Sequence, residues 1–360
     1  MKRVGNSIKG ILGGFVLLLI GIILLWWNEG NNVRNIKTTN EMSKVYVDVS
    51  SEKVEATNEG KLVATHGKLI NTQVMTDETF NVTIETPVLE RIVEIYQWEE
   101  DSSTDDDGDT TYSYKKVWSS DIIDSGNFHQ GGHDNPGVKP YEDQKWTSTD
   151  VKVGAFDLST KQIDMLSTDG KYNDFNLDTI TALGYKVEGL YVTNSDNLSS
   201  PKIGDVRISF LYNNSTEVSV LAVQSGNSFI DFTSEAGKNV NRVMDGSHNG
   251  QDMINVIVKE NNMIKWILRA AGILLLALGF GTILKPLSAV TSYVPLVGNV
   301  VGAAVGLVSF LLALALGFVI IAIAWIRFRP LLGIGLLVAV VAIIVLLKIR
   351  SKKAGEAKTE

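Results

Sequence analysis

The sequence predicts a membrane α-helical protein with four spans and one large, mostly β, α+β domain outside the membrane, between the first and second spans. Uncharged apolar runs lie near both ends of the 360-residue chain. Residues 28–263 carry a net charge of −18, whereas 1–27 carry +3 and 264–360 carry +8. The middle also alternates apolar and polar residues with the period of strands. This segregation excludes a purely soluble globule.

A basic N-terminal segment, residues 1–10, precedes the first predicted span at 11–27. This apolar run contains no charge and has about the minimum length for a bilayer-spanning helix, roughly 17 residues. A cleaved signal peptide is the alternative, because Lys2, Arg3 and Lys9 form a basic leader. No small-residue cleavage site follows, and Trp26 and Trp27 suit the membrane interface. We therefore favour a retained anchor.

The C-terminal third contains three more apolar runs. Arg269 lies near the start of the first, close enough to reach the headgroups. The expected order is a second span at 264–284, a short loop at 285–296, a third span at 297–326, a tight turn at 327–330, a fourth span at 331–347 and a basic tail at 348–360.

Basic residues near the spans predict the orientation. Lys2, Arg3 and Lys9 favour a cytoplasmic N-terminus, and residues 348–353 favour a cytoplasmic C-terminus, which four spans reconcile. The acidic domain would then be extracytoplasmic or lumenal. Five other basic residues would lie on that far side, against the rule: Lys259, Lys265, Arg269, Arg327 and Arg329.

The domain at 28–263 is long enough to bury its own core. Its β-branched and aromatic alternation predicts strands at 45–49, 82–98, 111–118, 151–156, 205–212 and 216–223, with short helices at 158–167 and 176–184. The acidic segment 99–110 is expected to be a solvated hairpin tip. A calcium loop is the weaker alternative, because Gly108 comes too early and Lys116 stands where an EF-hand needs glutamate.

No catalytic, cofactor-binding or metal-ligating residue can be assigned, and we expect a non-enzymatic protein without a cofactor. The absence of cysteine excludes disulfides and thiol chemistry, and no hydrolase or nucleotide-binding motif is present. His129 and His133 lie four apart, but the intervening glycines and the following Pro136 predict a loop. A metal site with Asp134 stays as an alternative to a structured turn. The acidic domain makes nucleic acid an unsuitable partner.

Glycines are regularly spaced in the third span. Gly298, Gly302 and Gly306 lie four apart on one helix face, which allows close backbone approach in lipid. This face could pack within the helix bundle or form a subunit contact in a homo-oligomer. The predicted spans contain no Asp or Glu, which disfavours an ion-coupled transporter.

Several short motifs occur in order along almost the whole chain. They include Asn58-Glu59-Gly60, Tyr96-Gln97-Trp98, Tyr112-Ser113-Tyr114, Gly132-His133 with Asn135-Pro136, Gly204-Asp205 with Arg207, and Asn262-Met263-Ile264-Lys265-Trp266. With the four spans, this order resembles the LUMA, or transmembrane protein 43, family.

The resemblance implies an integral membrane protein with cytosolic termini and a large domain on the far side. Eukaryotic members reside in the endoplasmic reticulum and inner nuclear membrane, self-associate and organise the envelope with lamin- and emerin-type partners. It also implies an architectural role for His133 in its loop. The lysine-rich, cysteine-free composition suggests a bacterial relative in a plasma membrane, to which lamin partners cannot be transferred.

Three functional hypotheses follow. The favoured one is a self-associating membrane scaffold that binds an unknown protein or envelope component through its extracytoplasmic domain. The second is a cation channel or channel subunit formed by the C-terminal helices, with Asn299 and Ser309 as polar candidates; the resemblance is compatible with it, since some members are linked to cation conductance. The third is a tethered hydrolase or metal enzyme using His129, His133 and Asp134.

Overall fold

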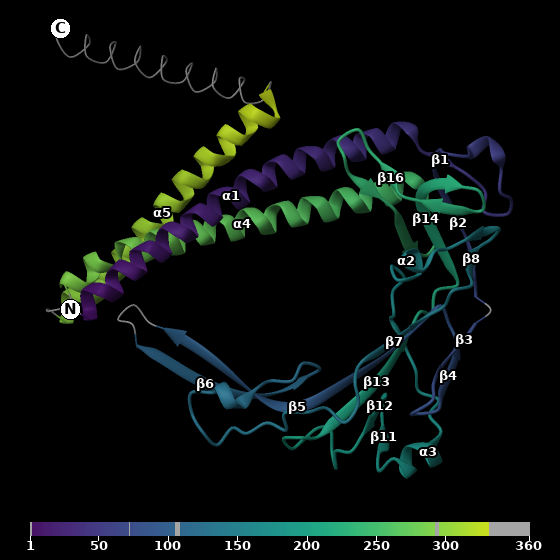
Figure 1. Cartoon of the computed structure of the whole chain (residues 1–360), viewed down its shortest axis with the longest axis horizontal. Helices are drawn as coiled ribbons and strands as arrows, with labels where there is room; N and C mark the ends of the chain where they lie inside the picture. The colour runs from purple at the N-terminus through teal and green to yellow at the C-terminus, as the bar shows by residue number, and fades with distance from the viewer. Residues whose placement is uncertain (1, 72, 105–108, 292–294, 331–360) are drawn as a thin grey trace, which may run out of the picture. The chain divides into compact units, whose positions relative to one another are not determined.

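The computed structural model describes residues 2–71, 73–104, 109–291 and 295–330, with the backbone alone for 2–9, 286–291 and 295–303. The chain divides into two compact units, one formed by residues 1–40 with 256–360 and the other by 41–255 (Figure 1). We call them the helical unit and the β-rich unit. The predicted fourth span at 331–347 and the tail at 348–360 lie outside the described residues.

The helical unit is built from three long helices, α1 (Lys2–Val45), α4 (Gly250–Thr291) and α5 (Pro295–Phe328). Each contains a segment long and apolar enough to cross a bilayer: Gly10–Val45, Gly250–Lys285 and Ala304–Phe328. Figure 1 shows α1 and α4 running side by side. Leu25, Leu276, Ala313 and Ile320 form the buried centre, whereas Phe15, Leu274 and Phe318 are 60%, 59% and 64% exposed. Apolar outer faces of this kind suit lipid, so the chain is a membrane protein with a β-rich domain.

Two helices are longer than the sequence predicted. α1 continues past residue 27 to Val45, and α4 begins at Gly250 and continues to Thr291 through part of the expected loop. Both extensions lack proline before Pro286 and pair polar side chains between the helices; the Asn35 Nδ2 donates to Asn261 Oδ1 at 2.8 Å. Asn249 caps α4 by accepting from the Asp252 amide at 2.8 Å. Helix α5 differs by only two residues at each end from the predicted 297–326.

The β-rich unit contains two seven-stranded sheets. The first has the order β15-β14-β2-β8-β9, with β1 beside β2 and β18 beside β14. Its strands are β1 (Val47–Asp48), β2 (Leu62–Asn71), β8 (Val151–Val153), β9 (Phe156–Asp157), β14 (Glu217–Ser225), β15 (Ser228–Ile230) and β18 (Arg242–Asp245). All its pairs are antiparallel except β1 with β2.

The second sheet is antiparallel, with the order β11-β12-β13-β5-β6, β10 beside β13 and β7 beside β5. Its strands are β5 (Val88–Thr104), β6 (Thr110–Ser119), β7 (Gln144–Thr147), β10 (Gly170–Lys171), β11 (Lys186–Glu188), β12 (Tyr191–Thr193) and β13 (Val206–Tyr212). The remaining elements are the pairs β3 (Val74–Asp77) with β4 (Val82–Glu85) and β16 (Phe232–Thr233) with β17 (Asn239–Val240), and the short helices α2 (Thr160–Ile163), α3 (Leu177–Ala182), η1 (Ala56–Asn58) and η2 (Ser125–Asn127).

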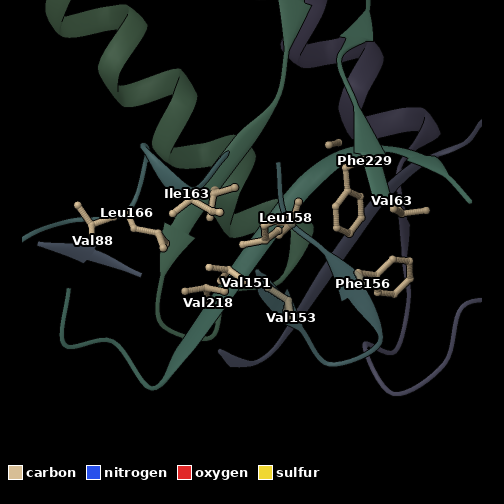
Figure 2. Packing of buried hydrophobic residues seen from close by; sticks show 13 residues of the cluster. Val63, Val88, Val151, Val153, Phe156, Leu158, Ile163, Leu166, Val218 and Phe229 are labelled. Carbon is tan, nitrogen blue, oxygen red and sulfur yellow. The ribbon is translucent and has the colours of Figure 1, made fainter. Parts of the chain in front are cut away.

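Each sheet has its own apolar core. Val63, Val151, Phe156, Ile163, Val218 and Phe229 lie in the first, where Figure 2 shows side chains from sheet and helix meeting. The second core gathers around Phe80, Leu89, Ile208 and Phe210. Alternating burial along β5 and β13 places every second residue in this core.

The predicted strand at 82–98 is wrong as a single element. It is divided into β4 and β5 at Thr86 and Pro87, because proline cannot donate to a sheet ladder. The buried Thr86 Oγ1 fixes the break, lying 3.1 Å from the Val88 carbonyl and 2.9 Å from that of Asn213. The predicted hairpin is confirmed, but its tip is shorter than 99–110. Strand β5 extends to Thr104 and β6 begins at Thr110, so residues 105–109, of which 105–108 lie outside the described residues, separate the strands.

Candidate functional site

Most family-motif residues of the β-rich unit gather along the second half of β5, whereas the Asn58-Glu59-Gly60 motif lies beside β14. A loop between β6 and β7 lies against β5; we call residues 121–138 the motif loop. The Asn135 side chain attaches the motif loop to β5 through hydrogen bonds to the strand backbone, as a neighbouring strand would. The Trp98 amide donates to Asn135 Oδ1 at 2.7 Å, and Asn135 Nδ2 donates to the carbonyls of Trp98 and Ile123 at 2.9 and 3.1 Å.

Gln97 fixes the start of the motif loop in the same manner. Its side chain is fully buried. Its Nε2 donates to the Asp121 carbonyl at 2.9 Å, and its Oε1 accepts from the Ile123 amide at 3.1 Å. Two adjacent residues of β5 therefore hold both ends of the loop. Gln97 binds through its own side-chain amide, and Trp98 binds through its backbone to the side-chain amide of Asn135.

Aromatic stacking holds the middle of the motif loop. The His133 ring stacks on Tyr114 at 3.8 Å and meets Trp98 edge-on at 4.7 Å, whereas His129 stacks on Tyr112 at 4.0 Å. Gly132 has a φ of +90°, a left-handed conformation that glycine adopts without strain. The placement of His133 supports the architectural role that the resemblance implied.

The Glu100 carboxylate joins these stacks to the loop backbone. It accepts from the Tyr114 hydroxyl and, at 2.6 Å, from the His129 amide. Desolvation and the hydrogen bond to Glu100 raise the pKa of Tyr114, so the phenol stays a donor. Among residues that the structure describes, no three His, Asp or Glu side chains group as metal ligands. The described residues therefore do not support a metal site at His129, His133 and Asp134.

The Gly204, Asp205 and Arg207 motif lies across β5 from the hairpin strand β6. The Gly204 amide donates to the Tyr96 carbonyl at 2.9 Å, and the Tyr96 amide donates to the Asp205 carbonyl at 2.8 Å. The Asp205 carboxylate accepts from the Ser195 hydroxyl at 2.5 Å and the Lys202 amide at 2.8 Å. A Cβ at Gly204 would lie 3.6 Å from Pro136, so this turn also contacts the motif loop.

Arg207 lies in an aromatic slot. Its guanidinium donates twice to Glu94, at 2.6 and 2.7 Å, and stacks over Trp118 at 4.7 Å and Tyr191 at 5.0 Å. Tyr96 contacts the same Trp118 ring, with 5.2 Å between centroids. The motif residues thus form a rigid frame, and the loop it supports presents exposed residues, including Val138 at 72% exposure and Ile122 at 37%.

Sequence reasoning missed a buried polar site in the helical unit. Glu29, just beyond the predicted end of span one, is fully buried. Its Oε1 accepts from Arg269 Nε at 2.7 Å and its Oε2 from Trp325 Nε1 at 2.8 Å, so one carboxylate joins α1, α4 and α5. The signal was a lone acidic residue two positions after paired tryptophans, with Arg269 as the matching charge.

Glycine contacts in the helical unit also differ from the predicted set. Gly14, Gly21, Gly272 and Gly279 bring α1 and α4 together; a Cβ at Gly21 would lie 3.1 Å from the Gly272 carbonyl oxygen. A Cβ at Gly306 would meet no described residue within 4 Å, and the surroundings of Gly298 and Gly302 lie outside the described residues. Close packing between α1 and α4 therefore uses glycines seven apart, and the four-residue ladder of α5 stays a prediction.

The channel candidates are only partly described. Ser309 is 2% exposed and donates to the Val305 carbonyl of its own helix at 2.7 Å. The side chain of Asn299 lies outside the described residues. The channel hypothesis stays a prediction that conductance measurements in planar bilayers would test.

Known proteins resemble this chain over almost its whole length. The family model for transmembrane protein 43 matches residues 95–330, from β5 to the end of α5. The mouse protein of that name is 29% identical over 98% of this chain and 93% of its own length, and the human protein is 28% identical over 98% and 92%. A fruit-fly homolog is 28% identical over 91% of each chain. No solved structure matches significantly. These matches confirm the resemblance carried by the motifs, and the chain belongs to the transmembrane protein 43 family.

Proposed function

We propose that this protein is a non-enzymatic membrane scaffold that self-associates through α5 and binds a protein or envelope partner through the β-rich unit. Both termini would face the cytoplasm, and the β-rich unit would lie on the other side. In a bacterial cell the site of action would be the plasma membrane.

The proposed self-association is supported mainly by the open surroundings of Gly306. Where glycines pack α1 on α4, an added Cβ would meet its nearest neighbour at short range, 2.7 Å away at Gly14 and 2.9 Å away at Gly279. A Cβ at Gly306 would meet none within 4 Å among the described residues. Its neighbours on α5 include Leu307 and Phe310, which are 60% and 49% exposed. Gly306 is thus a small residue of α5 that the other described helices leave open, and such a position suits contact with a second copy.

The motif loop supports partner binding. Its hydrogen bonds to Trp98, Gln97 and Glu100 fix its backbone, while Ile122 and Val138 remain exposed. A loop held rigid before binding loses little conformational entropy when a partner docks. A partner would therefore contact the loop surface, and the motif residues beneath would preserve its shape.

Self-association can be tested with the double variant Gly302→Leu/Gly306→Leu. Leucine would separate two helices that approach through this face, so we expect the purified full-length variant to have a smaller mass in mild detergent by light scattering. Gly13→Leu is the matched control, because a Cβ at Gly13 also meets nothing within 4 Å but lies on α1. An unchanged mass for the double variant would contradict the proposal.

Partner binding is tested separately with Val138→Glu. This change places a charge on the exposed loop without removing any of the hydrogen bonds that hold it. We expect crosslinking in native membranes to recover fewer partner adducts with this variant. Equal recovery would remove the motif loop as the contact surface.

A further inference from the structure

Basic and aromatic side chains gather where the end of α5 meets the middle parts of α1 and α4. Lys265 and Arg269 come from α4, Arg327 comes from the last turn of α5, and Arg329 directly follows that helix. Lys265 lies within electrostatic range of Arg269, Arg329 and Glu29. Arg269 also stacks over Trp266 at 4.7 Å, and Trp26 contacts Phe328 with 5.6 Å between centroids. Tryptophan and arginine at one level of a helix bundle are typical of the headgroup region.

The charges in this region do not balance. Glu29 is the carboxylate that interacts with Lys265 and Arg269, so the cluster of Lys265, Arg269, Arg329 and Glu29 carries a net charge of +2. The oxygens of Glu29 already accept from Arg269 and Trp325. An additional anion would therefore relieve the repulsion among these cations.

Arg329 supplies an independent sign of a missing ligand. Its Nη2 atom is buried and has no hydrogen-bond partner among the described residues. A buried guanidinium nitrogen without an acceptor is costly, and phosphate oxygens are the acceptors that arginine binds best. The Lys265 ammonium can approach the same oxygens, although in this structure it donates to Asn262 Oδ1 at 2.8 Å.

We propose that Arg329 and Lys265 bind the phosphate group of an anionic phospholipid. Glu29 neutralises Arg269 and joins the middle of α4 to the end of α5, while Trp26, Trp266 and Phe328 contact the upper part of the acyl chains. In the proposed orientation, the site would also account for basic residues on the side of the bundle where the positive-inside rule does not expect them. It goes beyond the scaffold function and does not depend on it.

The test is native mass spectrometry of the full-length protein, delipidated in detergent and then mixed with phosphatidylglycerol or with phosphatidylcholine of the same acyl chains. We expect the wild type to retain phosphatidylglycerol preferentially. Arg329→Gln and Lys265→Gln should each lower that retention about tenfold, as expected for loss of a charge-assisted hydrogen bond. Arg34→Gln is the matched control, because it removes one exposed positive charge from α1 and should retain the lipid.

Inorganic phosphate distinguishes a lipid site from a free-phosphate site. If the lipid is the ligand, phosphate ion will not displace phosphatidylglycerol; displacement would overturn the lipid assignment. Equal retention by the wild type and both glutamine variants would also overturn it. Circular dichroism on each variant checks that the helices are formed, and Lys265→Gln decides the outcome if Arg329→Gln does not fold.

Discussion

At the scale of single residues, side-chain amides complete a sheet where strands end. The pairing of β13 with β5 stops at Val206 opposite Ile95. Trp98, farther along β5 on the same side, would leave its amide and carbonyl unpaired there. The Asn135 side chain supplies both a donor and an acceptor. A motif residue that satisfies backbone groups cannot be replaced by a residue of similar size without an amide.

Replacing Asn135 by alanine should therefore release the motif loop. The variant leaves the Trp98 amide and two carbonyls without partners, which should reduce the free energy of unfolding by about 1–3 kcal/mol. Hydrogen exchange of residues 121–138 in the full-length protein should become faster. Asn214→Ala, at an exposed position, is the control. Exchange rates equal to the wild type in the loop would show that Asn135 does not hold it.

The carboxylate of Asp245, also a single residue, makes a pH-dependent contribution to the stability of the fold. Burial opposes its ionisation, but hydrogen bonds from the Ser215 hydroxyl, the Ser167 amide and the Asn213 side chain lower the pKa of Asp245 below its ordinary 3.8. Because the folded-state pKa is depressed, the ionised group stabilises the fold above 3.8 and loses this effect as the pH falls through the folded value.

Asp245→Asn should consequently lower the melting temperature at neutral pH. The difference from the wild type should shrink as the pH falls below the ordinary aspartate value, because the wild type then loses the same interactions. Thermal unfolding of the full chain across this range measures the effect. Asp178→Asn, on the exposed first turn of α3, is the control. A difference that stays constant with pH would refute the assignment to Asp245.

At the scale of elements, glycine spacing determines how closely two helices approach. Gly14 and Gly21 on α1 face Gly279 and Gly272 on α4, an antiparallel arrangement in which each glycine accommodates backbone or side-chain atoms of the other helix. A spacing of seven keeps residues on one side of a helix over two turns, as in a left-handed helix pair. This pattern is present in the sequence, but the four-residue ladder in α5 is the more familiar signal.

Gly272→Ala should weaken this helix pair. The new methyl group would lie 2.6 Å from Leu25, which is fully buried. Overpacking of this kind costs about 1–3 kcal/mol, more than alanine gains as a helix former. We expect a lower melting temperature in detergent. Gly13→Ala, with no atom within 4 Å of the new methyl group, should be neutral or slightly stabilising. A variant at Gly272 as stable as the wild type would contradict this close approach.

Elements with strong periodicity were predictable, and those governed by long-range contact were not. Helix α5 and strands β6, β13 and β14 lie close to their predicted ranges. Strand β2 was not predicted, because Gly67 interrupts its alternation of apolar and polar residues. A Cβ there would lie 2.3 Å from Ser51 Oγ, so the glycine serves a contact that sequence alone does not reveal. For the same reason the motifs identified Asn135, His133, Trp98 and Tyr114, but not that Asn135 binds Trp98 or that His133 stacks on Tyr114.

At the scale of the whole molecule, charge segregation corresponds to the division into two units. A lone charge inside an apolar bundle needs a partner of opposite charge. Glu29 accepts a hydrogen bond from Arg269, which lies 240 residues later in the sequence. The domain between α1 and α4 can be large because it has its own two cores. The number of spans then decides whether the chain's two ends lie on one side of the membrane.

Four spans place both termini opposite the β-rich unit, whereas three would place the C-terminus with it. The chain contains no cysteine, so single cysteines can be labelled without background. We expect a membrane-impermeant maleimide to label Val138→Cys, at a position 72% exposed, in intact expressing cells. Ser7→Cys and Ser351→Cys should be labelled only after permeabilisation. Labelling of Ser351→Cys together with Val138→Cys in intact cells would instead establish an odd number of spans, because each crossing reverses the side on which the chain continues.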